Sequence, residues 1–195
     1  MADGGIDMFT EFTPNSDNTK MLRKAFSRFA TGVTIVSCDS IDGHIGMTVN
    51  SFSSISLNPA LIMWAPDKRS SRFKYFEKAH YFAIHVLNFD QQALCNEFVK
   101  NKKAFDTFSH SISSKGVPII DNCLARFHCV KYDMHDAGDH KIIIGKDGKV
   151  FETFASINAS IHGAVLPLCV HGSRETKTTE SSGSCSQLLS AIISA

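Results

Sequence analysis

The stretch Gly46–Ile55 constrains the fold of this chain more than any other. Every second residue from Ile45 to Val49 is apolar, which predicts a half-buried strand. The next apolar residue, Phe52, falls outside this alternation, and a slip of one residue turns side chains to the opposite face of a sheet. We therefore expect the strand to break or bulge within Asn50–Ser54, where backbone N–H and C=O groups would lack ladder partners.

Uncharged hydrogen-bonding groups are concentrated in the same stretch, and its glycine would let a flat ligand approach the backbone closely. Together with unpaired amides, these groups suit a neutral ring that carries several acceptors. A serine-rich strand and turn with internally satisfied hydroxyls would have the same composition, and a short Ser/Thr run is a weak motif. The candidate binding residues are Gly46, Thr48, Val49, Asn50, Ser51, Ser53 and Ser54.

Composition argues against several classes of function. A net charge of +1 over 195 residues gives no general reason to expect nucleic acid or an anionic surface as a partner, and no basic stripe with interleaved aromatics is present. No apolar run reaches the roughly 18 residues of a membrane span. The N-terminus shows no secretory signal pattern, so the six cysteines, which include no CxxC pair, are expected to be reduced thiols of a cytoplasmic protein.

The rest of the pattern predicts a mainly β fold with flanking helices. A helix should run from about residue 17 to Phe29, and Asp42-Gly43 and Asp147-Gly148 are hairpin signals. Because the helices do not alternate regularly with strands, we expect an antiparallel sheet closed into a barrel rather than a doubly wound parallel sheet. Apolar or alternating runs occupy 33–38, 60–64, 81–87, 123–132, 140–145, 150–154 and 163–170.

A serine pair offers a second candidate site. Ser70 and Ser71 stand at the start of an expected short helix, beside Lys68 and Arg69. Hydroxyls, free N–H groups and cations together suit a phosphate. The alternative is a plain helix cap with surface charges.

His140 is a third candidate, because it follows Gly138-Asp139, a flexible residue and a carboxylate that could orient its ring. A lone histidine is more often a surface or core residue. The other histidines show no metal-binding spacing such as HExxH, so no metal site is predicted, and His85, inside a strand, is expected to be structural. Cys95 and Cys129 lack a neighbouring base in sequence that would mark a nucleophile.

Five stretches have an order and spacing that can be compared with known families: Arg28–Val36, Gly46–Ser54, Asn58–Leu61, Phe82–Leu87 and Gly138–His140. In this order and spacing they resemble the flavin reductase domain with the FMN-binding split-barrel fold, the small reductase partner of two-component flavin monooxygenases. The resemblance covers about residues 18–174. Residues 1–17 and the Ser/Thr-rich residues 175–195 are then expected to be tails, the second of them disordered.

The resemblance implies a six-stranded antiparallel split barrel that forms a homodimer, with flavin near the subunit interface. It also implies that NADH or NADPH reduces bound FMN or FAD. The enzyme would then supply reduced flavin or electrons to a partner oxygenase. Thr48–Ser54 would hold the isoalloxazine and ribityl parts, and Ser70 and Ser71 would hold the phosphate. His140 would lie on the nicotinamide side as the catalytic residue. The choices between FMN and FAD and between NADH and NADPH stay open.

One departure from the family bears on nicotinamide use. After the last strand the family usually carries an aromatic residue near a Gly-Arg pair, whereas this chain reads His171–Glu175 and no aromatic follows. Two other functions stay open. One is a non-enzymatic or electron-transfer FMN-binding protein on the same barrel, and the other is a structural or interaction protein whose site has decayed.

Overall fold

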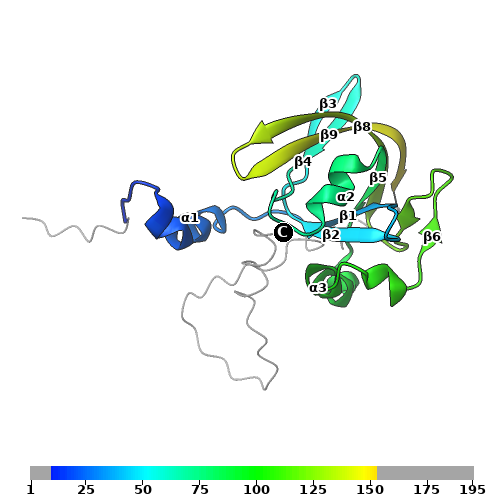
Figure 1. The fold of residues 1–195 in the computed structure, drawn as a ribbon, viewed down its shortest axis with the longest axis horizontal. Helices are drawn as coiled ribbons and strands as arrows, with labels where there is room; N and C mark the ends of the chain where they lie inside the picture. Colours follow the sequence, from blue (N-terminus) through cyan, green and yellow to red (C-terminus); the bar gives the residue numbers. More distant parts are fainter. Residues whose placement is uncertain (1–9, 153–195) are drawn as a thin grey trace, which may run out of the picture.

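The computed structural model describes residues 10–152. Within them, seven antiparallel strands form a curled sheet in the order β2-β1-β5-β8-β9-β4-β3, and β6 pairs with β7 separately (Figure 1). The strands are β1 (Thr34–Cys38), β2 (Ile45–Val49), β3 (Ser53–Leu57), β4 (Ala60–Trp64), β5 (Tyr81–Val86), β6 (Ser111–Ile112), β7 (Pro118–Ile119), β8 (Ala125–Ala137) and β9 (His140–Glu152). The helices are α1 (Thr19–Phe26), α2 (Phe73–Lys78) and α3 (Gln92–Lys100), with single 3-10 turns at Ser16–Asn18, Phe89–Gln91 and Ala104–Asp106.

The predicted break in the opening stretch is confirmed. β2 ends at Val49, β3 begins at Ser53, and the three residues between them belong to neither strand. These two strands form the opposite edges of the sheet, yet so short a link spans at most about 14 Å from Val49 to Ser53. The sheet must therefore curl until its edges almost meet. β3 also bulges at Ile55, since Ser54 pairs with Ile62 but Ser56 with Leu61.

The expected closed six-stranded barrel is corrected in two respects. The sheet has seven strands, because Asn50–Phe52 leave the ladder and so divide one expected strand into β2 and β3. Within residues 10–152 no ladder joins β2 to β3, so the sheet is curled but not closed. The mainly β class, the antiparallel pairing and the flanking helices are as expected.

The two hairpin signals have different outcomes. Asp42-Gly43 does form the β1–β2 turn, where Gly43 has φ +97° and its N–H donates to the Ser40 carbonyl at 3.0 Å. Asp147-Gly148 is not a turn, because β9 runs unbroken from residue 140 to 152. His128 pairs with Lys149 and Cys129 with Asp147, so Gly148 is a bulge in β9. The long pairing with β8 absorbs the extra residue, and the chain turns at Gly138, φ +64°.

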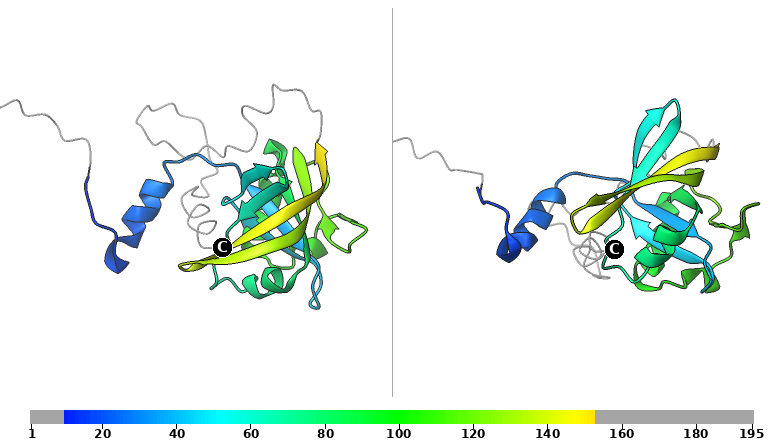
Figure 2. Two further views of the ribbon diagram at one scale, coloured as in Figure 1. Left: turned by 90° about the horizontal axis from the view of Figure 1, so that it is seen from above. Right: turned by 45° about the horizontal axis from the view of Figure 1, so that its top comes forward.

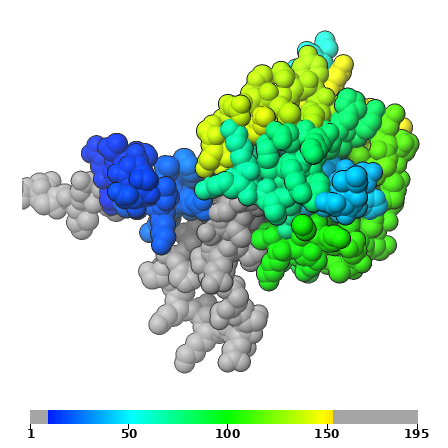
Figure 3. Space-filling model, in the orientation of Figure 1, coloured from blue at the N-terminus to red at the C-terminus, as the bar shows by residue number. Residues whose placement is uncertain are grey.

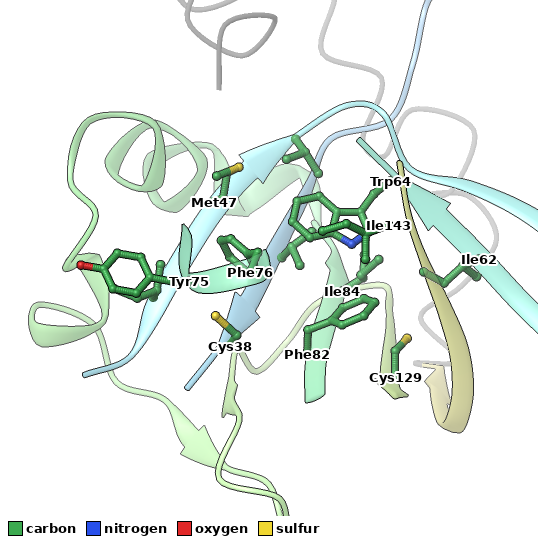
Figure 4. Packing of buried hydrophobic residues seen from close by; sticks show 13 residues of the cluster. Cys38, Met47, Ile62, Trp64, Tyr75, Phe76, Phe82, Ile84, Cys129 and Ile143 are labelled. Carbon is green, nitrogen blue, oxygen red and sulfur yellow. The ribbon is translucent and has the colours of Figure 1, made fainter. Parts of the chain in front are cut away.

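Two apolar layers stabilise the sheet. On the inner face, Trp64, Phe76, Phe82 and Ile143 pack together, and α2 contributes Phe76 to this layer (Figure 4). On the other face, α3 covers β1 and β2 through a second cluster that includes Phe98 and Phe105. The β8–β9 hairpin crosses the molecule beside this core (Figure 2). The expected thiol character of the cysteines holds for Cys38, Cys95 and Cys129, which are buried and form no disulfide.

The first helix stands apart from the sheet (Figures 1 and 2). It ends at Phe26, one turn before the expected end at Phe29, and none of its residues is buried. Its apolar stripe is exposed, with Phe26 at 62% and Phe29, just beyond the helix, at 77%. No helix within residues 10–152 is long and apolar enough to cross a membrane. The expected run at 163–170 and tail at 175–195 lie outside the described residues.

Candidate functional site

The structure places the first residues of the predicted flavin stretch inside the protein. Thr48 is fully buried, and its hydroxyl donates to the Cys95 carbonyl of α3 at 3.0 Å. A methyl group on Gly46 would lie 2.1 Å from a ring carbon of Phe98. The flat group that approaches Gly46 is thus a phenylalanine of the same chain. The expectation that the Gly46 surface and the Thr48 hydroxyl contact a flavin is corrected, because α3 occupies both.

Two further candidates in this stretch are also engaged. Val49 is 2% exposed, and its carbonyl accepts a hydrogen bond from the Thr34 hydroxyl at 3.2 Å. The Ser51 hydroxyl accepts from the Ala65 N–H at 2.9 Å and donates to the Ala65 carbonyl at 3.2 Å. Ser51 thereby ties the break between β2 and β3 to Ala65, the residue that follows β4.

Three candidates in the stretch are left with surface available to a ligand. Asn50 is half-buried, and Ser53 and Ser54 are exposed on β3. The Ser53 hydroxyl makes a local bond to the Ser54 carbonyl at 3.2 Å, which a ligand could replace at little cost. The candidate side chains of this stretch that stay accessible are therefore those of Asn50, Ser53 and Ser54.

The structure brings the serine-pair segment and the His140 segment together. Beyond β4 the chain stays beside β9, so that Asp67 forms a bridge with His140 and the Pro66 carbonyl accepts from the Lys141 N–H at 3.1 Å. The Lys68 N–H donates to the Asp139 carbonyl and its ammonium donates to the Gly138 carbonyl, each at 2.9 Å. Figure 3 shows the hairpin (yellow-green) against the segment that leads into α2 (teal).

The cations in this segment are already paired with carboxylates. Arg69 forms a bidentate ion pair with Asp67, which is 1% exposed, at distances from 2.6 to 3.2 Å. Hydrogen bonds from Arg69 hold the pKa of Asp67 below its usual value. Lys68 pairs with Asp136 at 2.8 Å. The cations expected beside Ser70 and Ser71 are therefore present, but each is paired with a carboxylate of the same chain.

The serine pair lies just before α2 rather than inside its first turn. The Ser70 hydroxyl accepts from the Arg72 N–H at 3.3 Å, and Ser71 is exposed. Sequence reasoning missed Arg72, whose side chain is 6% exposed and donates to the Val99 carbonyl of α3 at 3.2 Å. Burial lowers the pKa of Arg72. A cation directly after the two serines was the signal that could have identified it.

The imidazole of His140 is oriented by its neighbour, as expected. Its Nδ1 lies 2.7 Å from Oδ1 of Asp139, so Nδ1–H donates to the carboxylate and Nε2 is left for another partner. This hydrogen bond holds the pKa of Asp139 below its usual value. His140 is about one-third exposed, with its side chain at 30%. The arrangement presents a ring nitrogen in a fixed direction at the edge of the site.

The other candidate groups have structural roles. His85 is fully buried, with Nδ1 at 3.0 Å from the Ile35 carbonyl and Nε2 accepting from the Ile120 N–H at 3.2 Å. Burial lowers the pKa of His85 to about 3, so it is neutral at pH 7. Burial raises the pKa of Cys95 to about 11 and also raises that of Cys129. Within residues 10–152 no group of three His, Cys, Asp or Glu side chains could hold a metal.

Known proteins share both the sequence and the fold. The flavin reductase-like domain family matches residues 26–154. The FMN reductase (NADH) SmoA of Agrobacterium fabrum is 49% identical over 135 residues, covering 69% of this chain and 78% of that protein. The reductase component of the flavin-dependent trigonelline monooxygenase of Acinetobacter baylyi is 42% identical over 129 residues, covering 64% of this chain and 41% of that protein.

Among solved structures, an NADH:FAD oxidoreductase of Streptomyces globisporus, in complex with NAD and FAD fragments, is similar with a TM-score of 0.68. It is 28% identical, and the similarity covers 74% of this chain and 88% of that chain. Fold and site thus define an oxidoreductase that works with a flavin and a nicotinamide nucleotide. The chain belongs to the flavin reductase-like domain family. The family, the enzyme class and the two cofactors predicted from the sequence are confirmed.

Proposed function

We propose that this flavin reductase binds its flavin where the β2–β3 break meets residues 66–71, and that His140 faces the nicotinamide. The observation that supports this is the convergence of three segments. Ser51 holds Ala65, and the residues that follow Ala65 hold the turn of the β8–β9 hairpin. The name of SmoA, an NADH-dependent FMN reductase, favours FMN and NADH as the preferred pair here.

The groups available at this place fit the two ends of a flavin. Asn50, Ser53 and Ser54 offer neutral amide and hydroxyl groups, which suit the several acceptors of an isoalloxazine ring. Ser71 offers an exposed hydroxyl for the phosphate, beside the buried cation of Arg72. The engaged side chains of Thr48 and Ser51 would then shape the site rather than contact the ligand.

The chain's own residues bind and orient rather than react. When bound, the flavin and the nicotinamide themselves supply the hydride chemistry. Ser51 fixes the path of the backbone at the break, and Lys68 fixes the hairpin turn that carries His140. Asp139 holds the imidazole so that Nε2 can hydrogen-bond a nicotinamide amide, and correct placement of this kind contributes much of the rate in such reactions.

The activity is tested by mixing purified protein with FMN or FAD and with NADH or NADPH, and following nicotinamide absorbance. Fastest oxidation is expected with FMN and NADH, and no oxidation with any pairing would refute the function. The place of the site is tested with Ser53→Trp, which should abolish flavin binding while circular dichroism stays unchanged. Ile41→Trp, at a fully exposed position in the β1–β2 turn, is the matched control. Normal flavin affinity in the Ser53 variant would refute the proposed location.

We further propose that the protein is a homodimer. Leu57 is 94% exposed on the edge strand β3, and Phe26 and Phe29 are exposed at α1. Large exposed apolar side chains of this kind mark surfaces that another protein covers. Sedimentation should show a dimer that Leu57→Glu shifts toward monomer, whereas Ile41→Glu should leave it intact. A monomeric wild type would refute this proposal.

The partner of the reduced flavin is proposed to be a flavin-dependent monooxygenase, because the Acinetobacter baylyi relative is the reductase component of such an enzyme. A cytoplasmic location is proposed with it, since Cys38, Cys95 and Cys129 are buried thiols suited to a reducing compartment. Substrate hydroxylation by an added oxygenase, with this protein and NADH as the electron source, tests the partnership. Failure of every flavin monooxygenase tried, despite active flavin reduction, would contradict it.

A further inference from the structure

A cavity lies on the outer face of the sheet, away from the proposed flavin site. It has a volume of about 160 Å³ and lies between β5, β8, β9 and the loop that joins β6 to β7. Lys149 on its wall and His140 at the hairpin turn are nine residues apart on β9, which is roughly 30 Å along a strand. The cavity is therefore a separate place on the molecule.

The walls of this cavity are mainly apolar. Ala83, Val117 and Val130 line it together with the ring of Tyr81. Ala83 and Val117 belong to one small apolar cluster, against which Tyr81 packs. Engineered apolar cavities of about 150 Å³ accept a benzene-sized molecule. The size and lining therefore suit a single ring.

The two lysine side chains that line the cavity are cationic. Lys115 and Lys149 line it, and the Lys115 ammonium lies 5.2 Å from the centre of the Tyr81 ring. Neither lysine forms an ion pair with any of residues 10–152. Nε2 of His128, another lining residue, is buried and has no hydrogen-bond partner among residues 10–152.

The charges around His128 favour an anion. Burial lowers the pKa of His128, and the charges of Arg126 and Lys149 lower it further. The nearby carboxylates are engaged elsewhere. Asp121 faces Arg126 at 3.7 Å, and Asp147 accepts from the Cys129 thiol at 3.1 Å. An entering carboxylate would thus meet the cations of Lys115 and Lys149.

We propose that this cavity binds a small aromatic carboxylate, with its ring between Tyr81 and Val117 and its carboxylate between Lys115 and Lys149. The apolar walls remove the ring from water, and the two ammonium groups select the anion. The site is independent of the flavin site and of the proposed reductase pairing.

Benzoate titrated into the full-length protein, followed by calorimetry and by protein-observed NMR, tests the proposal. Saturable binding is expected, with resonances of the β6–β7 loop among those that shift. The double variant Lys115→Met/Lys149→Met should weaken binding by about tenfold or more, because it removes two charge-assisted contacts. Lys78→Met, which removes an exposed charge at the end of α2, is the matched control and should bind normally.

Benzyl alcohol, an uncharged ligand of similar size, separates charge recognition from simple filling of an apolar space. It should bind at least about tenfold more weakly than benzoate. The proposal is overturned by an absence of saturable benzoate binding, by equal affinity for the two ligands, or by unchanged affinity in the double lysine variant. These readouts do not depend on flavin or nicotinamide, so they are distinct from the tests of reductase activity.

Discussion

Replacing Gly46 by alanine separates two interpretations of the opening stretch. The added methyl would lie 2.1 and 2.4 Å from two ring carbons of Phe98 and 3.1 Å from Phe105. Phe98 would have to retreat by about 1.3 Å to reach an ordinary contact. It is fully buried, with the Phe105 ring centre 4.8 Å away, so it has little room to move.

The cost of Gly46→Ala follows from this crowding. Overpacking a core costs about 1–3 kcal/mol, and complete expulsion of a phenylalanine would cost about 3–5 kcal/mol. Against this, alanine restricts the unfolded chain and returns about 0.4–1 kcal/mol. We expect a net loss near 2 kcal/mol, or roughly 4–8 °C in Tm. Gly148→Ala is the matched control, because its methyl would meet the His128 carbonyl at an ordinary 3.4 Å.

Denaturant unfolding of a double-mutant cycle with Phe98→Val provides the assay. Valine lacks the ring atoms that the methyl would meet, so Gly46→Ala should be nearly neutral in that background, with a coupling of about 1–2 kcal/mol. Wild-type stability of Gly46→Ala would refute the packing argument. Loss of flavin binding in a folded double variant would instead restore Gly46 as a ligand contact.

Three more predictions follow from the buried groups and the site. Because the pKa of His85 falls from 6.5 to about 3 on folding, the unfolded chain binds the extra proton. The free energy of unfolding should therefore drop by up to about 1.4 kcal/mol per pH unit as pH falls from 6.5 toward 3. In His85→Asn, denaturant titrations should show a shallower dependence, and an equal slope would contradict the assignment. Ser51→Ala should lose about 1–2 kcal/mol in urea unfolding, because the backbone groups of Ala65 lose their partner, whereas unchanged stability would show that this link to the end of β4 does not stabilise the fold. His140→Ala should lower kcat/KM for NADH at least about tenfold and change the flavin Kd little. Asp139→Asn should cause a smaller loss, and equal activity of all three proteins would remove His140 from the site.

Much of the fold was predictable because its signals are local. The phase slip after Val49 does mark the point where β2 ends, and Asp42-Gly43 does form a turn, since each depends on a few neighbouring residues. The same reasoning failed at Asp147-Gly148, where thirteen residues of β8 hold β9 in one strand and turn the glycine into a bulge. The expected six strands are seven in the structure, because β2 and β3 are separate strands at opposite edges of the sheet, which periodicity does not show.

The candidate site was predictable as a set of segments but not as a set of contacts. The sequence pointed to the hydroxyl-rich stretch, the serine pair and His140, and residues beside all three do come together. It did not show that α3 occupies the Thr48 hydroxyl or that Lys68 and Arg69 are already paired. Composition cannot distinguish a satisfied hydroxyl from a free one, because the partner lies far along the chain.

The sequence by itself thus determined the β-rich class, the break at Asn50–Phe52 and the family, all of which rest on residue types at short spacing. Only the tertiary structure decided which polar groups stay available to a flavin. The groups of Thr48, Ser51 and Lys68 are satisfied by Cys95, Ala65 and Asp136, which are distant in the sequence and come within hydrogen-bonding distance only in the folded chain. The curl itself follows from the three residues that tie one edge strand to the other.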